Sequence, residues 1–305
     1  MITDGLHWIS SFYGELAALS AAFLWALASV LYSRIGRYLS PLKMNLLKNV
    51  LAMVMAMTVL LGEGGLFGGF DKYAVILLLL SGAVGIGLGD SAYFGALKHI
   101  GARRALLIMI LSPPITGIMA FVFLGETLSA GAWLGIFITI AGVSWVISER
   151  AGGAGLNGAS VKPGILLGML AAVGQSAGAV LSHAAFIHSN ISPIRSALLR
   201  LLGGTFIVIL AMPLMKDDAG HGYRNLNSLR RWETMILTVF IGTFLGIWLQ
   251  QISLKYAAAG IAQTLFSTSP LFVIPIVILT GERVSLRAVL GALLAMIGVG
   301  FLFQH

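Results

Sequence analysis

Long apolar runs separated by short polar joints make up most of the chain. Each run has about the 20 mostly apolar residues that a helix needs to cross a bilayer, and no stretch shows the alternation typical of strands. Ten runs are predicted to be membrane helices: 14–33, 45–62, 74–97, 104–124, 130–148, 163–187, 194–214, 233–254, 260–279 and 285–303. We therefore expect an all-α integral membrane protein with ten transmembrane helices.

The second half of the chain repeats the first. The segment "SPPITGIMAFVFLGETLS" (112–129) returns as "TSPLFVIPIVILTGERVS" (268–285), about 156 residues later, so that Pro114 meets Pro270. Nearly the whole chain follows the same relation, with small changes in the shift. Further pairs with the same or similar residues are Gly85 with Gly242, Gly89 with Gly246, Glu126 with Glu282, Lys43 with Arg195, and Lys48 with Arg200.

This repeat predicts how the halves are arranged. We expect one five-helix unit over 1–150, a glycine-rich linker over 151–162 and a second five-helix unit over 163–305. Because five is an odd number of crossings, the second unit must run through the membrane in the opposite direction. Inverted repeats of this kind are typical of secondary transporters, whose substrate sites lie near the midplane where the repeats meet.

Composition excludes several other classes of protein. The 305 residues are 58% hydrophobic and 10% charged, whereas a soluble domain has about 25% charged residues. The formal charge of +8 lies in joints between apolar runs, which favours helix flanking over nucleic-acid binding. There is no cysteine, so disulfides and thiolate chemistry are excluded. The opening "MITDGLHWISSFYGE" lacks the features of a cleaved signal peptide.

Each half ends in a similar motif, "LGET…G…AGV" and "TGER…G…IGV", and residues 89–107 read "GDSAYFGALKHIGARRALL". With the five-plus-five repeat, these motifs resemble the drug/metabolite transporter superfamily, in particular its EamA branch. The resemblance implies a carrier of amino acids, other metabolites, drugs or sugar derivatives, located in the cell membrane. It also implies a central cavity formed mainly by helices 1, 3, 4, 6, 8 and 9.

Asp90 has the most informative position among the candidate residues. It lies deep in the third apolar run, where ionisable groups are rare and usually functional, and its counterpart in the repeat is Ile247. We expect it to carry protons or to bind a substrate amine; the alternative is an ion pair with Lys98 or with another helix. Glu15 is a second candidate for proton coupling, or it stabilises the start of the first helix.

Polar and aromatic side chains inside the apolar runs form the predicted substrate site. A cavity needs a few oriented polar groups among apolar walls, although each such group could instead make a hydrogen bond between helices. The candidate substrate-binding residues are Trp25, Ser29, Asp90, Tyr93, Ser112, Gln175, Ser176, His183, Trp248, Gln251, Gln263 and Ser267, and Gln250 shares their character.

Three prolines interrupt the apolar runs at repeated positions. Pro113 and Pro114 lie in the fourth run and Pro270 in the ninth. Proline removes a helix hydrogen bond, and broken helices often line transporter sites. We expect helix breaks beside the substrate, the alternative being kinks that serve packing alone.

Other charged residues have structural interpretations. Lys48 and Arg200 lie about one turn inside their helices, where long basic side chains can reach the headgroups. We expect them to anchor the helices, with attraction of anions as the alternative. Glu126 and Glu282 each precede a serine that can cap the next helix, so we expect them to close a turn and favour a helix N-terminus.

No ATP-binding motif, metal-ligand spacing or nucleophile motif is present, so we expect no cofactor, no metal and no enzymatic activity. A passive channel, a non-transporting membrane protein and an intramembrane enzyme are the alternatives to a transporter, and the sequence leaves monomer and dimer open.

The orientation of the chain in the membrane is open too. The positive-inside rule places the basic joints in the cytoplasm and both termini outside, whereas the family resemblance predicts the reverse.

Overall fold

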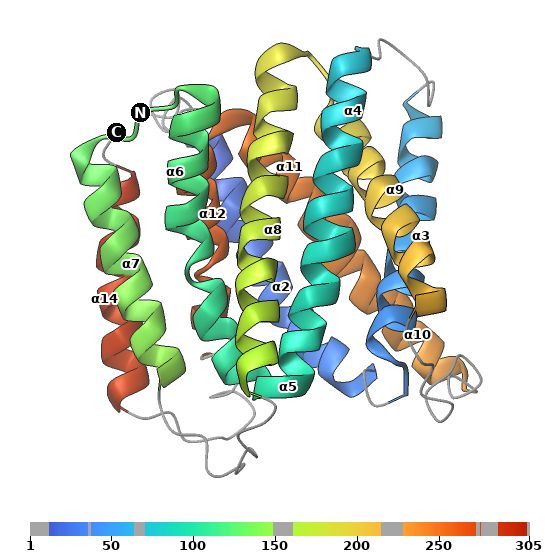
Figure 1. The fold of residues 1–305 in the computed structure, drawn as a ribbon, viewed down its shortest axis with the longest axis horizontal. Helices are drawn as coiled ribbons and strands as arrows, with labels where there is room; N and C mark the ends of the chain where they lie inside the picture. The colour runs from blue at the N-terminus through green and yellow to red at the C-terminus, as the bar shows by residue number, and fades with distance from the viewer. Residues whose placement is uncertain are drawn as a thin grey trace, which may run out of the picture.

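A computed structural model of the chain describes residues 12–35, 38–63, 71–148, 161–214, 228–272, 275 and 286–303. Every regular element in these ranges is helical, and the helices stand side by side as a bundle (Figure 1). The first half contains α2 (Tyr13–Ile35), α3 (Pro41–Gly62), α4 (Lys72–Ser81), the π-helix η1 (Gly82–Gly89), α5 (Asp90–Met109), α6 (Ser112–Leu124) and α7 (Ala130–Ser148). The second contains α8 (Val161–His188), α9 (Pro193–Ala211), the 3₁₀ turn η3 (Met212–Leu214), α10 (Leu229–Thr238), the π-helix η5 (Val239–Leu245), α11 (Gly246–Tyr256), α12 (Ala259–Phe266) and α14 (Leu286–Leu302).

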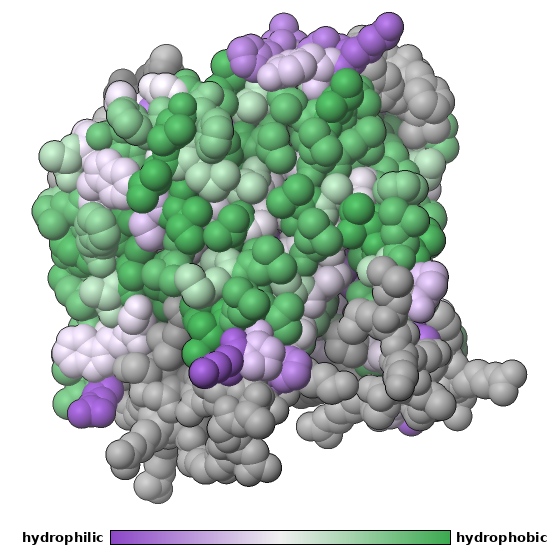
Figure 2. All heavy atoms as spheres, viewed as in Figure 1, coloured by the Kyte–Doolittle hydropathy of each residue, from purple (hydrophilic) through white to green (hydrophobic). Residues whose placement is uncertain are grey.

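The outer surface of the bundle is apolar. Large side chains such as Leu166 and Phe123 are each 69% exposed, and Figure 2 shows a broad apolar band with hydrophilic residues at its upper and lower edges. Water would not cover such a band at low cost, but lipid does. Five stretches of the described chain are long and apolar enough to cross a membrane: Leu42–Gly62, Lys72–Ala96, Lys162–His188, Pro193–Ala211 and Leu229–Tyr256. Shorter apolar helices are Tyr13–Ala28, Ser112–Leu124, Ala130–Val146 and Val289–Leu302.

Small residues set the spacing of the helices. In a bilayer, helices associate through close packing rather than through the hydrophobic effect, and glycine lets two backbones approach. Gly142 of α7 lies against Ala295 of α14, and Gly298 of α14 lies against Thr139 of α7. Gly82 of η1 lies against the backbone of Arg200 in α9, so this basic residue is held where two helices are in direct contact.

The chain reverses direction within the helical range of α5. Gly95 lies against Leu167 of α8, while Ile108 lies against Gly168, the next residue of α8. Thirteen residues of straight helix would span about 20 Å, so Gly95 and Ile108 can reach neighbouring residues only if the chain turns back between them. This reversal coincides with the predicted joint between the third and fourth apolar runs, over 98–103, although the helical conformation continues through it.

Both proline sites coincide with helix breaks. Ile110 and Leu111 form a turn between α5 and α6, and Pro113 and Pro114 lie in the first turn of α6, where a missing N–H leaves no helix bond unmade. In the second half α12 ends at Phe266, residues 267–268 form a turn, and helical conformation resumes at 269–270. The prolines therefore begin new helical segments instead of kinking a continuous one.

The two halves pack together in matching ways. The helix pairs α3 with α9, α6 with α12, and α7 with α14 are in contact. In addition, η1 and α5 pack on α8, while η5 and α11 pack on α2. The rings of Phe12 and Phe303 lie 5.1 Å apart, so the first and last described residues are on the same side of the bundle (Figure 1).

Candidate functional site

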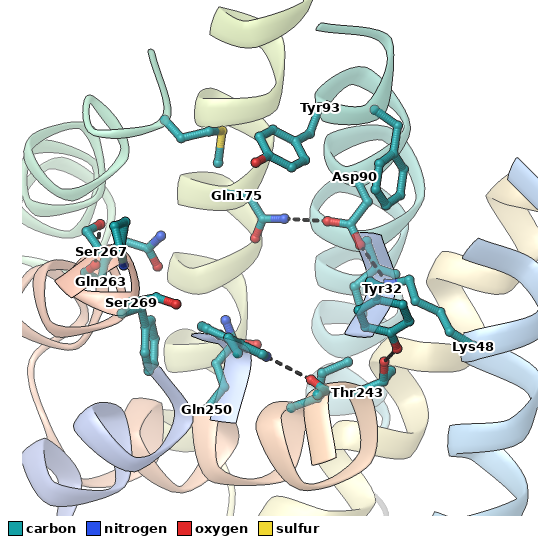
Figure 3. A pocket seen from close by; sticks show the side chains of 18 of the residues that line it. Tyr32, Lys48, Asp90, Tyr93, Gln175, Thr243, Gln250, Gln263, Ser267 and Ser269 are labelled. Carbon is teal, nitrogen blue, oxygen red and sulfur yellow. Dashed lines mark hydrogen bonds and ion pairs between the residues drawn. The ribbon is translucent and has the colours of Figure 1, made fainter. Parts of the chain in front are cut away.

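A cavity of about 390 Å³ lies among helices of both halves, within the size range of small-molecule sites. Its walls come from α2, α3, η1, α5, α8, α9, η5, α11 and α12, and from the breaks after α5 and α12. The polar lining residues are Tyr32, Lys48, Asp90, Tyr93, Gln175, Arg200, Thr243, Gln250, Gln263, Ser267 and Ser269, most of which are visible in Figure 3. The apolar wall includes Trp25, Ile86, Phe94, Met109, Ile110, Ile247, Phe266 and Pro270.

Asp90 connects three helices at the cavity wall. One carboxylate oxygen, Oδ2, lies 3.1 Å from Nζ of Lys48 in α3, and the other, Oδ1, accepts a 2.8 Å hydrogen bond from Nε2 of Gln175 in α8. Figure 3 shows the carboxylate between these two side chains. The exposed fractions of the Lys48 and Asp90 side chains are 11% and 21%. An ion pair this sheltered is stronger than a surface pair, so Asp90 is tied to another helix through Lys48.

Lys48 and Arg200 are not lipid anchors, and the prediction that they are is wrong. Both line the cavity. Arg200 is 1% exposed, and its Nη1 donates a 2.7 Å hydrogen bond to Oε1 of Gln250. A basic residue one turn inside a helix can reach the headgroups only if its face of the helix meets lipid. Here α3 and α9 turn that face toward the bundle, so these two helices join the six expected from the family resemblance.

The π-helices of both halves supply hydrogen-bond acceptors to side chains that line the cavity. Nε2 of Gln175 also donates to the carbonyl of Gly85 in η1 (3.2 Å), and Nε1 of Trp25 donates to the carbonyl of Gly242 in η5 (2.8 Å). The sequence repeat pairs Gly85 with Gly242, and at a shift of 150 residues it pairs Trp25 with Gln175. Each half therefore offers a π-helical carbonyl to the first helix of the other half, which keeps both donors at the cavity wall.

The structure brings six of the predicted substrate-binding residues to the cavity wall, and with them the predicted break at Pro270. These six are Trp25, Asp90, Tyr93, Gln175, Gln263 and Ser267. Sequence reasoning missed Tyr32 and Thr243, whose hydroxyls are 2.6 Å apart, and it misassigned Lys48 and Arg200. A cation recurs at the same place in both halves, and this recurrence was the signal that could have placed Lys48 and Arg200 at the cavity.

Five other predicted residues are not among those that line the cavity. Ser112 and Ser176 are buried, with their hydroxyls 3.0 Å apart, and Nε2 of Gln263 donates to Oγ of Ser112 (3.0 Å). Gln251 is buried and accepts a 2.7 Å bond from Ser196. The remaining two residues have other neighbours, since Trp248 packs on Phe244 and His183 contacts the Leu254 carbonyl.

Five further predicted residues either do not line the cavity or lie outside the described side chains. Glu15 is 3% exposed and is not among the lining residues. Pro113 and Pro114 start α6 without lining the cavity. The side chain of Ser29 lies outside the described residues, as does Glu282.

Glu126 has a structural role at a helix N-terminus. Both of its carboxylate oxygens lie 3.3 Å from the backbone nitrogen of Ala259, at the start of α12, and Oε1 lies 3.7 Å from Nε2 of His183. The helix it caps therefore belongs to the other half of the chain. The local helix start is capped by Ser129, whose Oγ accepts a bond from the backbone N–H of Ala132, as its sequence position suggests.

No group of three or more His, Cys, Asp or Glu side chains within the described ranges could hold a metal ion. The cavity instead offers two cations, one carboxylate, amides, hydroxyls and aromatic faces. Such a lining suits reversible binding of a small polar or amphipathic molecule.

The sequence of the chain is similar to those of known membrane transporters. Residues 12–148 and 162–304 each match the model of the EamA-like transporter family. An uncharacterized transporter of Clostridium kluyveri is 23% identical over 142 residues, 46% of each chain, so the match spans about half the length of that relative. The uncharacterized transporter YyaM of Bacillus subtilis is 24% identical over 249 residues, 81% of this chain and 79% of its own.

A solved crystal structure of a protein superposes on 95% of both chains with a TM-score of 0.80 at 18% identity. A likeness at that identity shows the fold alone. The family matches cover most of the chain, and the described helices are apolar on their outer faces. The chain is therefore a multi-pass membrane protein that belongs to the EamA-like transporter family.

Proposed function

We propose that this protein is a secondary transporter that carries a small polar or amphipathic metabolite, such as an amino acid or a related compound, by alternating access. The observation that carries the proposal is a cavity of about 390 Å³ between the two halves, with charged and amide side chains on apolar walls. A carrier needs such a site deep in the membrane, shared by two units that can move against each other. Membership in a transporter family supports the same function.

The architecture that suits this function is ten spans in two inverted five-helix units, 1–150 and 163–305, joined by the linker over 151–162. Three features support it. Equivalent helices contact one another across the halves, the π-helices η1 and η5 occupy equivalent positions, and the turns at 110–111 and 267–268 are separated by 157 residues. An even number of crossings also suits the position of Phe12 and Phe303, the first and last described residues, on one side of the bundle.

The two broken helices are suitable moving parts. Met109 and Ile110 line the cavity at the first break, and Phe266, Ser267 and Pro270 line it at the second. A turn between two helical segments lets one segment tilt without disturbing the other, because few backbone bonds cross it. In this proposal each break opens the cavity to one side of the membrane in turn.

Asp90 is the proposed coupling residue. Its carboxylate connects α5 with α3 of the same half through Lys48 and with α8 of the other half through Gln175. Binding of a proton would remove the charge that holds Lys48, which would weaken the connection between these helices. A carboxylate whose charge controls contacts in both halves can link proton movement to the change of access.

The test begins with the purified full-length chain. Compounds from a metabolite library that raise its unfolding temperature bind the folded state, and each is then used in reconstituted proteoliposomes. A secondary transporter should take up labelled compound faster when unlabelled compound is present inside. A compound that binds but does not cross would contradict transport, and passage that unlabelled compound inside does not accelerate would indicate a channel.

A further inference from the structure

The cavity carries one positive charge more than it carries negative charges. Among the described residues that line it, Lys48 and Arg200 are cations and Asp90 is the carboxylate. The 3.1 Å ion pair between Lys48 and Asp90 balances two of these charges. Arg200 makes no direct ion pair with a described carboxylate, although the Asp90 charge acts on it at longer range. A sheltered cation that must share one counterion with a second cation is costly.

Arg200 itself has unused hydrogen-bonding capacity. Its guanidinium has five N–H donors, yet its bond within the described chain runs from Nη1 to the neutral Oε1 of Gln250. Nε is buried without a hydrogen-bond partner, and Nη2 lies close to Gly85 of η1. Arginine pairs best with a planar carboxylate that accepts two parallel bonds, and none of the described carboxylates makes an ion pair with it.

Comparison of the two halves shows which group Arg200 lacks. The repeat pairs Lys48 with Arg200 and Asp90 with Ile247, and all four residues line the cavity. In the first half the cation therefore meets a carboxylate on the third helix. In the second half the equivalent position holds an apolar side chain, so the protein supplies the cation without its partner.

We propose that the substrate supplies the missing carboxylate, and that it is an organic monoanion with an apolar or aromatic body. Its carboxylate binds the guanidinium of Arg200 beside Ile247, and its body lies against aromatic side chains of the wall such as Trp25, Phe94 and Phe266. An additional ammonium group on the substrate is disfavoured, because both oxygens of Asp90 are already used by Lys48 and Gln175. The proposal rests on the transport function proposed above and narrows its substrate class, because among the small metabolites considered there it favours acids without an ammonium group over amino acids.

The experiment measures binding to the purified full-length protein by thermal unfolding and calorimetry. The probes are 3-phenylpropionate, its amide, the matching 3-phenylpropylamine and the zwitterion phenylalanine, with two parallel sets that carry indolyl and isobutyl bodies. We expect at least one acid to bind about tenfold more tightly than its amide, its amine and its zwitterion. If no acid exceeds its amide, or if the zwitterion or amine binds best, the proposal is overturned.

Two substitutions test the role of Arg200. Arg200→Gln should reduce the ratio of acid affinity to amide affinity to about one. Ile247→Asp should supply the missing carboxylate within the protein and abolish the preference for the acid over its amide, whereas the uncharged control Ile247→Asn should keep that preference. Arg200 is buried, so Arg200→Gln could lose structure. Ile247→Asp leaves Arg200 in place and therefore tests the proposal independently. Acid affinity that stays unchanged in Arg200→Gln and in Ile247→Asp overturns it.

The two proposals can fail separately. An acid that binds through Arg200 but shows no exchange in proteoliposomes contradicts transport and leaves the anion site intact. Exchange of a neutral or cationic metabolite at wild-type rate in Arg200→Gln contradicts the anion site and leaves transport intact.

Discussion

The Asp90 carboxylate is the residue whose chemistry the proposed mechanism depends on most. Asp90→Asn keeps the shape of the side chain and removes its charge, so Lys48 loses its ionic partner. We predict that the variant loses accumulation driven by a proton gradient but retains exchange of substrate, because the cavity keeps its other ligands. Both rates are measured in proteoliposomes at equal protein content.

Two results would contradict this role of Asp90. Wild-type rates in both assays would leave the carboxylate as a structural residue. Loss of both rates, together with loss of substrate binding, would make it a ligand of the substrate instead. The double variant Lys48→Gln with Asp90→Asn is the control for an unpaired cation, because it removes both charges.

Serines inside and outside the cavity wall should behave differently. Ser176 is buried and hydrogen bonded to Ser112, away from the wall, so Ser176→Ala should lower the free energy of unfolding by about 0.5–1.5 kcal/mol. Its substrate affinity should stay as in the wild type. Ser267 lines the cavity, so Ser267→Ala should weaken binding with a smaller loss of stability. Thermal unfolding with and without ligand measures both, and weaker binding in Ser176→Ala would place that serine in the site.

Individual residues were predictable where a polar side chain interrupts an apolar run. Asp90 and Gln175 are polar in an apolar run, which is enough to suggest a cavity, and both line it. Lys48 and Arg200 were misassigned because these helices are apolar on most faces, so periodicity does not tell which face meets lipid. Their position near a helix end suited an anchor equally well. The partners that decide the matter, Asp90 and Gln250, come from other helices.

Among the elements, α7 and α14 give the clearest test of packing. A Cβ on Gly298 would overlap the backbone nitrogen and Oγ1 of Thr139, whereas a Cβ on Gly300, in the same helix, would meet open space. We predict that Gly298→Ala lowers the free energy of unfolding by about 1–3 kcal/mol. Gly300→Ala should be neutral or slightly stabilising because alanine favours helix. Equal stabilities of the two variants, measured by thermal unfolding in detergent, would contradict the close contact.

The apolar runs predicted that the chain is helical in the membrane, but they did not predict the local helix geometry. The prolines lie just after both breaks, since proline fits the first turn of a new helix. The π-helices were not predicted, because a π-helix depends on what its carbonyls meet. Here the side chains of Gln175 and Trp25, from distant parts of the chain, bond to the carbonyls of Gly85 and Gly242.

For the whole molecule, the repeat was the most informative property of the sequence. It paired Gly85 with Gly242 and Lys48 with Arg200 before any contact was known, and all but Gly85 line the cavity. Sequence alone could not show that α3 and α9 take part in the cavity, since that depends on how the two halves dock. Nor could it assign the substrate, because the site is assembled from single residues on many helices.

The central claim is that this cavity lies on a route between the two sides of the membrane. The chain has no cysteine, so single cysteines report without background. Ser267→Cys places a thiol at the cavity wall, and Ser176→Cys places one in a buried position. Thr127→Cys, in the joint between α6 and α7, and Arg230→Cys, in the first turn of α10, are exposed controls. The joint and the start of α10 lie at opposite ends of the bundle (Figure 1).

The measurement is labelling by a membrane-impermeant thiol reagent applied to either side, in intact cells and in inside-out vesicles. We predict that Ser267→Cys reacts from both sides, that each exposed control reacts from one side, and that Ser176→Cys stays unlabelled. Reaction of Ser267→Cys from one side alone, or from neither side while the controls label, would contradict the account.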